Sequence, residues 1–167
     1  MPDIIVLAHN IRSTHNVGAI FRTADGFGVK EIIFSGYTPY PTTKRDNRLP
    51  HIREKITRDI HKTALGAEET VPFRIVDAPP LAELKAAGYT VVALEQSENS
   101  TPLQHYKTPP KVALLLGEEV SGITNELLSA CDVTVEIPMV GEKESFNVSV
   151  AAAIALYQIA VVNYNKS

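Results

Sequence analysis

A small polar cluster near the C-terminal end of the chain, Ser145, Asn147 and Ser149, has residue types that can bind a ligand. It follows a loop containing Pro and Gly and comes just before a long apolar helical pattern. Buried donors and acceptors without partners are costly, so a bound ligand or a second chain would have to satisfy these groups. The alternative is local: Ser145 caps the helix, and Asn147 and Ser149 satisfy neighbouring backbone groups. The segment alone does not separate the two.

Two further clusters have the same character. Residues 16–24 (NVGAIFRTA) open a helical pattern, whereas residues 114–123 (LLLGEEVSGI) and the first cluster's segment, residues 137–149, each follow a predicted strand. In parallel α/β sheets, ligands bind beyond the carboxyl ends of the strands, so these loops are the expected site. Residues 94–96 also end a strand and are expected to join them.

The elements that must position these clusters alternate between strands and helices. This alternation predicts an α/β fold with a mostly parallel, six-stranded sheet and helices on both of its faces. A continuously apolar run, VALLLG, is typical of a central strand buried on both sides. The predicted strands are residues 4–8, 31–35, 73–76, 89–94, 111–116 and 133–137.

Five helices are predicted, four of them between these strands and one after the last strand. The first begins at Asn16 as its N-cap residue and ends near Gly26 or Gly28, with Arg22 off its apolar stripe. The last is apolar around nearly its whole circumference, which indicates burial and favours packing against another subunit. The stretch from 36 to 52, with three prolines, is predicted to be irregular. The other helices cover about residues 57–65, 81–87 and 125–130, and the last covers about 147–162.

The composition predicts one folded domain, residues 1–167, with 44% hydrophobic and 21% charged residues. Cys131 is the only cysteine, which excludes an intramolecular disulfide and favours a cytoplasmic protein, with the thiol in the core rather than acting as a nucleophile. No apolar segment is long enough to span a membrane. The sequence has no metal-ligand spacing, no dinucleotide-binding or P-loop glycine pattern, and no G-x-S-x-G elbow.

Charge is distributed unevenly along the chain. The formal net charge is −3, but the segment from Lys44 to Lys62 holds seven bases and three acids, so it carries +4 and leaves −7 on the rest. A local basic patch on an acidic protein favours one contact with a polyanion. A solvated loop and helix face is the alternative, and charge alone slightly favours it.

Taken together, the three clusters resemble the SpoU/TrmH branch of the SPOUT RNA methyltransferases, which transfer methyl from S-adenosylmethionine to a ribose 2′-hydroxyl. The resemblance spans nearly the whole chain and includes residues 62–73, KTALGAEETVPF. Phe146 stands where the family usually has Leu, which adds bulk beside the ligand loop. The matching residues are Asn16, Gly18, Ala19 and Arg22 in the first motif, Gly117, Glu119 and Gly122 in the second, and Ile137, Pro138, Met139, Gly141, Ser145, Asn147, Val148 and Ser149 in the third.

The resemblance implies a deep trefoil knot in the C-terminal part and a homodimer with the site at the subunit interface. Periodicity does not predict the knot, whereas the all-round apolar last helix independently favours a dimer through that helix. The resemblance also implies that the chain lacks the RNA-binding extensions of many relatives. Substrate selection is then expected from the basic segment.

The catalytic roles also come from the resemblance. Arg22 matches the family's essential arginine; because a guanidinium stays protonated, we expect it to hold RNA phosphate and polarise the hydroxyl, although a base role activated by substrate phosphate stays open. Glu119 is expected to orient Arg22 or to stabilise its own loop, and Asn16 to contact Arg22 or RNA. The predicted catalytic residues are Arg22, Asn16, Glu119, Ser145 and Asn147.

The resemblance also implies a set of cofactor contacts, and the charge pattern predicts a set of RNA contacts. Glycines in the cofactor set are expected to let the backbone approach the ligand closely. The predicted contacts to S-adenosylmethionine, and to its product S-adenosylhomocysteine, are Leu94, Glu95, Leu116, Gly117, Glu118, Ile137, Pro138, Met139, Gly141, Ser145, Phe146 and Asn147. The predicted RNA contacts are Arg22, Lys44, Arg45, Arg48, Arg53, Lys55, Arg58 and Lys62.

The sequence therefore predicts an RNA 2′-O-ribose methyltransferase that acts on tRNA, with a D-loop guanosine as the favoured position. Ribosomal RNA is the competing substrate. A non-catalytic RNA-binding module that kept the fold, and a small-molecule methyltransferase, are the alternatives from other classes. The intact motif residues disfavour the first, and the +4 segment disfavours the second.

Overall fold

The computed structural model describes residues 1–163 and is built around one parallel sheet of seven strands. The strand order is β3-β2-β1-β6-β4-β7-β5, and every neighbouring pair is parallel. The strands are β1 (Asp3–His9), β2 (Glu31–Ser35), β3 (Phe73–Val76), β4 (Thr90–Leu94), β5 (Thr101–Pro102), β6 (Lys111–Leu116) and β7 (Val133–Glu136).

The prediction of a six-stranded sheet was wrong by one strand. All six predicted strands are present, but β5 adds a seventh by pairing with β7 at the edge of the sheet. Two residues are too few to show a period of two, and one of them is a proline, a residue that sheets tolerate at their edges. The sequence pattern therefore had no signal for this strand.

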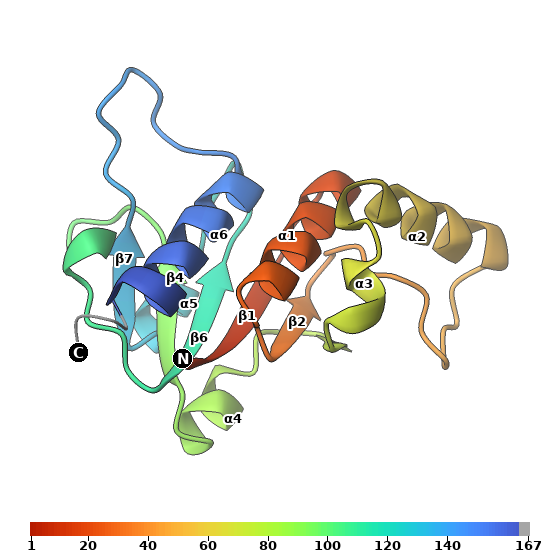
Figure 1. Ribbon diagram of the computed structural model, residues 1–167, viewed down its shortest axis with the longest axis horizontal. Coiled ribbons are helices and arrows are strands. Elements are labelled where there is room, and N and C mark those ends of the chain that lie inside the picture. The colour runs from red at the N-terminus through yellow and green to blue at the C-terminus, as the bar shows by residue number, and fades with distance from the viewer. Residues whose placement is uncertain (164–167) are drawn as a thin grey trace.

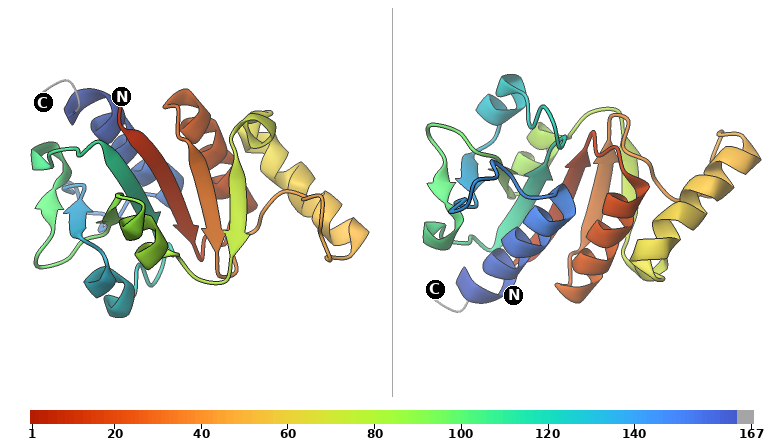
Figure 2. Two further views of the ribbon diagram at one scale, coloured as in Figure 1. Left: turned by 90° about the horizontal axis from the view of Figure 1, so that it is seen from below. Right: turned by 90° about the horizontal axis from the view of Figure 1, so that it is seen from above.

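Helices cover both faces of the sheet, as the alternation predicted (Figures 1 and 2). On β1, Ile4, Val6 and Ala8 belong to the core beneath α1 and α6, whereas Ile5 and Leu7 belong to the core beneath α4 and α5. Successive side chains of a strand point to opposite faces, so one apolar run supplies both cores. The helices are α1 (Thr14–Gly26), α2 (Pro50–Ala64), α3 (Ala67–Thr70), α4 (Leu81–Ala86), α5 (Asn125–Ala130) and α6 (Val148–Tyr157).

The helix beginnings differ from the predictions at two places. Ser13, not Asn16, is the N-cap residue of α1, and its hydroxyl accepts a hydrogen bond from the Asn16 backbone N–H. Helix α2 begins at Pro50 rather than near residue 57, so the end of the segment predicted to be irregular is helical. Proline is well suited to the first turn of a helix because its missing N–H needs no partner there.

The C-terminal helix continues past α6 as a π-helical segment, Gln158–Asn163. Asn163 is buried within this segment and donates a hydrogen bond to the Leu103 carbonyl oxygen. This contact fixes the end of the described chain against the short 3₁₀ helix Leu103–His105. Within residues 1–163, no helix is long and apolar enough to cross a membrane.

The strand order brings the three motif clusters to one edge of the sheet. From β1 the chain moves outward through β2 to β3, and the other strands lie on the far side of β1, beginning with β6. The order therefore reverses between β1 and β6, and ligands of open α/β sheets bind outside the carboxyl ends of strands at such a switch point. The loops that follow β1 and β6 meet there.

Candidate functional site

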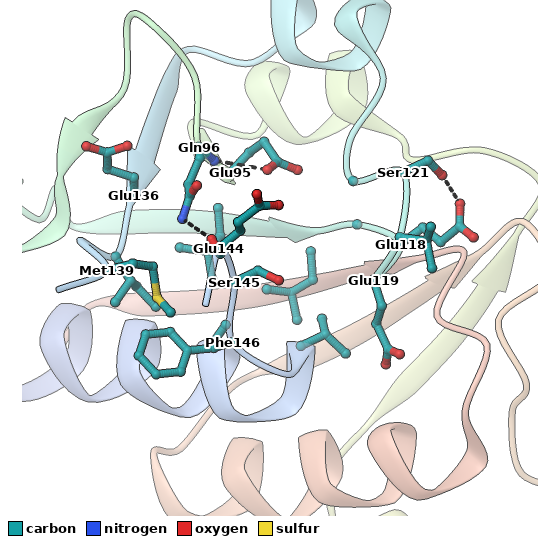
Figure 3. Close-up of a pocket in the computed structure, with 18 residues that line it drawn as sticks. Glu95, Gln96, Glu118, Glu119, Ser121, Glu136, Met139, Glu144, Ser145 and Phe146 are labelled. Atoms are coloured by element: carbon teal, nitrogen blue, oxygen red, sulfur yellow. Dashed lines mark hydrogen bonds between the residues drawn. The ribbon is translucent and has the colours of Figure 1, made fainter. Parts of the chain in front are cut away.

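A cavity of about 300 Å³ lies beyond the carboxyl ends of β4, β6 and β7 (Figure 3). Its size is at the lower end of the range for small-molecule sites. Apolar side chains and the polar groups of three loops line it together. The lining residues are Leu94, Glu95, Gln96, Leu116, Gly117, Glu118, Glu119, Val120, Ser121, Gly122, Glu136, Ile137, Met139, Glu144, Ser145, Phe146, Val148 and Ala151.

Glu95 ties two of these loops together. One carboxylate oxygen accepts the Ile123 backbone N–H at 2.9 Å, and the other accepts the Gln96 backbone N–H at 3.0 Å. A Cβ added to Gly117 would lie 3.0 Å from the Ile123 backbone nitrogen, so the loop can fold back on itself only with glycine here. Gly122 has a φ of +66°, a left-handed conformation that favours glycine.

Three motif side chains form one hydrogen-bonded network beside the cavity. The Asn16 side-chain amide donates to Glu119, and the Asn147 side-chain amide donates to the Asn16 Oδ1 at 3.2 Å. Asn16 is buried on α1, Glu119 lies in the loop after β6, and Asn147 begins α6. The network therefore joins segments that are 103 and 131 residues apart in sequence.

The local interpretation of the Ser145 cluster is met by a different residue, and Ser145 and Asn147 are exposed in the described chain rather than buried without partners. Asn147, not Ser145, is the N-cap residue of α6, and its Oδ1 accepts from the Ser149 backbone N–H and hydroxyl. Ser145 instead lines the cavity. Asn147 thus combines the local capping role with a tertiary contact to Asn16.

The walls of the cavity are acidic. Five glutamates and no lysine, arginine or histidine are among the lining residues. Figure 3 shows Glu119 turned toward α1, whereas Glu118 and Ser121 lie together on the other side of their loop. The Ser121 hydroxyl donates to Glu118, and this hydrogen bond lowers the pKa of the Glu118 carboxyl. A site of this kind suits a small ligand that carries positive charge.

Arg12 is a residue that the sequence reasoning missed. Its guanidinium pairs with the Glu118 carboxylate at 3.3 Å, so a cation from the loop after β1 lies beside the cavity wall. No motif match pointed to Arg12; only the strand order places the β1 and β6 loops together. Glu136 lies outside the predicted clusters and also lines the cavity, whereas Gln96 and Glu144 lie in loops that were expected to form the site but were not among the predicted contacts.

Arg22 is not part of the Asn16–Glu119–Asn147 network. It is exposed on α1, as its position off the apolar stripe indicated. Glu119 was expected to orient Arg22 or to stabilise its own loop; within residues 1–163 it accepts a hydrogen bond from Asn16, and no hydrogen bond or ion pair joins it to Arg22. Hydrogen bonds therefore join Asn16, Glu119 and Asn147, Ser145 lines the cavity beside them, and Arg22 is exposed.

Most of the predicted cofactor contacts gather at the cavity. Nine of the twelve line it, and Pro138, Gly141 and Asn147 do not. A Cβ on Gly141 would meet nothing within 4 Å in the described chain, so no contact within the chain itself requires glycine here. Phe146 lies on the α6 side of the cavity, near Met139 in Figure 3.

The predicted basic segment lies on α2 and the loop before it. Its cations differ in how far their charges are already paired within the chain. Arg48 is committed within the chain: it pairs with Asp46, stacks 3.8 Å from the Tyr40 ring centroid and donates to the Tyr40 and Pro41 carbonyl oxygens. Its hydrogen bonds hold the pKa of the Asp46 carboxyl far below its usual range. Arg48 is therefore the weakest of the predicted RNA contacts.

The remaining cations of this segment face solvent more freely. Lys55 and Lys62 both pair with Asp59, and their hydrogen bonds lower the pKa of that carboxyl. Arg53 is half-buried and donates to the Asp46 carbonyl oxygen. Lys44, Arg45 and Arg58 are exposed, and no ion pair is formed by them within residues 1–163.

Two other chemistries find no support in the described residues. Burial raises the pKa of the Cys131 thiol to about 11, so the thiol stays protonated near neutral pH, as expected for a packing residue. Residues 1–163 contain no group of His, Cys, Asp and Glu arranged to hold a metal ion.

Comparison with known proteins identifies the family of this architecture. Residues 3–157 match the sequence model of the SpoU rRNA methylase family. The tRNA (guanosine(18)-2′-O)-methyltransferase of Escherichia coli K12 is 32% identical over 161 residues, which are 94% of this chain and 62% of the relative. The 23S rRNA (guanosine-2′-O-)-methyltransferase RlmB of Neisseria meningitidis is 34% identical over 157 residues, which are 93% of this chain and 57% of the relative. The chain thus spans less than two thirds of these relatives.

Solved structures show the same fold. The TrmH/SpoU tRNA modifying enzyme of Aquifex aeolicus superposes with a TM-score of 0.80 at 28% identity, over 99% of this chain and 78% of that one. The SpoU methyltransferase AviRb of Streptomyces viridochromogenes, in complex with AdoMet, superposes with a TM-score of 0.76 at 25% identity, over 98% of this chain and 61% of that one.

Proposed function

This chain belongs to the SpoU rRNA methylase family, and from that premise we propose that it is an S-adenosylmethionine-dependent RNA methyltransferase that modifies a ribose 2′-hydroxyl. One observation carries the proposal. The Asn16–Glu119–Asn147 network joins all three motif segments beside a single cavity. Residues so distant in sequence meet at the edge of the sheet where an α/β fold binds its ligands.

The cavity residues fit S-adenosylmethionine. Leu94, Leu116 and Ile137 supply apolar walls for a flat heterocycle, and the glutamates complement the positive charge of the ligand. When bound, the cofactor supplies an electrophilic methyl group on a sulfonium. The chain's own residues must hold the ribose hydroxyl in line and help to remove its proton.

We assign the residues as follows. The network fixes the loop after β6 and the start of α6, so Glu119 acts first as an acceptor for Asn16. Ser145 shapes the cavity. Arg22 holds RNA phosphate and polarises the hydroxyl, since a guanidinium remains protonated and serves as a donor rather than as a base. The Glu118 carboxyl, whose pKa is lowered, serves as the counter-ion of the Arg12 guanidinium.

A tRNA is the proposed substrate, with guanosine in the D-loop as the favoured position. The support is the relative from E. coli, which acts on tRNA guanosine 18. Ribosomal RNA is the second candidate because a relative of similar identity acts on 23S rRNA. The exposed cations Lys44, Arg45 and Arg58 are proposed to meet the RNA backbone, and the single free thiol of Cys131 fits a cytoplasmic location.

The proposal includes a homodimer and a C-terminal knot. The outward face of α6 supports the dimer: Val150, Ala153, Ile154 and Tyr157 recur at helical spacing on it, and Val150 and Tyr157 are 46% and 51% exposed. The knot rests on membership of the family.

The test is methyl transfer from isotope-labelled S-adenosylmethionine to unmodified tRNA and, separately, to rRNA. The RNA is digested, and the labelled nucleoside is identified by mass spectrometry for the wild-type protein and for Arg22→Ala. We expect a labelled 2′-O-methylguanosine from tRNA that falls by about 100-fold or more in the variant, while cofactor binding, measured by calorimetry, is retained.

The other outcomes separate the alternatives. Label in rRNA alone would replace tRNA as the substrate. Binding of RNA and cofactor without transfer to either pool would point to a missing partner or a narrower substrate, and RNA binding without cofactor binding would favour a non-catalytic module. Cofactor binding without salt-dependent RNA binding would favour a small-molecule methyltransferase.

A further inference from the structure

The acidic cavity poses an electrostatic problem for an RNA substrate. A nucleotide within RNA carries a phosphate on each side of its ribose, and five glutamates line the cavity that this ribose must approach. Like charges at close range in a partly desolvated site repel strongly. A cation is therefore needed at the edge of the cavity, and none is among its lining residues.

Arg12 is the cation that the fold provides there. It follows β1, and Glu118 follows β6, so their ion pair bridges the switch point of the sheet. Glu118 lines the cavity, which places the Arg12 guanidinium one side chain away from it. Among residues 1–163, it is the only Lys or Arg that forms an ion pair with a residue lining the cavity.

The geometry of the Arg12–Glu118 ion pair allows Arg12 to leave Glu118 for another anion. The side chain of Arg12 is 75% exposed, that of Glu118 is 19% exposed, and the single N–O contact of 3.3 Å is long. Exposed pairs of this kind contribute little to stability. Glu118 accepts only one N–H bond from Arg12 here, whereas a phosphate that approaches from solvent can accept two parallel N–H bonds from the guanidinium. The Ser121 hydroxyl remains as a partner for Glu118 when Arg12 leaves.

We propose that Arg12 is a substrate-positioning residue that binds a phosphate flanking the target ribose and so places this ribose at the β1–β6 switch point. This inference rests on the proposed function and adds a residue outside the family motifs matched above. In this scheme Glu118 holds the guanidinium in place until RNA arrives. Arg12 would then act on RNA binding and leave cofactor binding unchanged.

The test compares Arg12→Ala and Arg12→Lys with the wild-type protein on one tRNA transcript that the wild type methylates. Lys30→Ala is the matched control. Lys30 is also an exposed cation in an ion pair, at 62% exposure and 3.0 Å from Asp3, but it lies at the opposite, amino-terminal edge of the sheet. KM and kcat for RNA, the dissociation constant for the cofactor, and RNA affinity between 50 and 200 mM salt are measured.

For Arg12→Ala we expect the KM for RNA to rise about tenfold, with a smaller change in kcat and no change in cofactor affinity. The slope of log affinity against log salt should fall by about 0.7 to 0.9, the value for one phosphate contact. Arg12→Lys should restore the slope but only part of the affinity, because an ammonium cannot form the bidentate contact. Lys30→Ala should match the wild type.

Two results would overturn the inference while leaving the proposed function intact. One is an RNA affinity and salt slope of Arg12→Ala equal to those of the wild type. The other is a loss of cofactor affinity in both Arg12 variants, which would show that Arg12 stabilises the wall of the cavity instead of binding RNA. If the wild type methylates no RNA and binds neither RNA nor cofactor, the proposed function fails and this inference fails with it.

Discussion

At the scale of single residues, Asn16 shows how one side chain serves folding and the site together. The sequence placed it at a helix end, and the structure moves that capping role to Ser13. Its amide is then free to bridge Glu119 and Asn147, which come from distant segments. Since these hydrogen bonds are charge-assisted or partly buried, losing them leaves polar groups without partners.

We predict that Asn16→Ala lowers kcat by about 10- to 100-fold, because the loop after β6 and the start of α6 lose their common anchor. The free energy of unfolding should fall by about 1–3 kcal/mol. Single-turnover methylation and denaturant unfolding measure the two effects. Asn125→Ala, at an exposed position on α5, is the control. Unchanged turnover in a folded Asn16→Ala protein would show that the network does not position the site.

At the scale of elements, the packing of α1 on α2 explains a glycine of the first motif. A Cβ added to Gly18 would lie 2.3 Å from the Ile60 carbonyl oxygen and 2.1 Å from the Thr63 hydroxyl. The first of these atoms belongs to the backbone of α2, so it cannot move without displacing that helix. This motif glycine therefore sets the distance between the helix that carries Asn16 and the helix that carries the basic segment.

We predict that Gly18→Ala destabilises the protein by about 1–3 kcal/mol, the usual cost of overpacking. Gly26→Ala is a matched control on the same helix, because its Cβ would meet nothing within 4 Å. That change should be neutral or stabilise the fold by about 0.4–1 kcal/mol through the unfolded chain. Urea unfolding of both variants decides the point. Equal stability of the two would show that α2 adjusts freely against α1.

At the scale of the whole molecule, α6 has one side that packs in the core and one side that is open to a second chain. Its all-round apolar sequence predicted burial on every side, but the described chain buries only one side of it. Ala152 and Leu156 are fully buried against the core, so charge there would test the fold rather than the dimer. Val150 and Tyr157 lie on the exposed side, where the Tyr157 ring also meets Phe27 of the segment after α1.

We predict that Val150→Glu and Tyr157→Glu convert a dimer into a folded monomer, whereas Ala152→Glu unfolds the chain. Sedimentation velocity at tens of micromolar measures the assembly, and circular dichroism measures the fold. The reason is that a buried carboxylate without a partner is costly on either surface, but only Ala152 faces the chain's own core. A monomeric wild type, or variants that remain dimers, would remove α6 as the interface.

Sequence reasoning succeeded where the signal is local. Runs such as VALLLG are apolar because both faces of a central strand are covered, and six strands were predicted correctly from runs of this kind. It failed where the local signal is weak or ambiguous. The two-residue β5 has no period, and Pro50 was taken as part of a loop although proline also begins helices.

The same difference between local and long-range signals applies to the candidate site. The positions of the three clusters were predicted because each follows a strand or begins a helix, and the resemblance to the family supplied the individual cofactor contacts, most of which line the cavity. Only the tertiary structure decided that Asn16 meets Glu119 and Asn147, that Arg48 is bound up in its own loop, and that Arg12 lies beside Glu118. Side-chain contacts between distant segments depend on strand order and register, and no local periodicity encodes those.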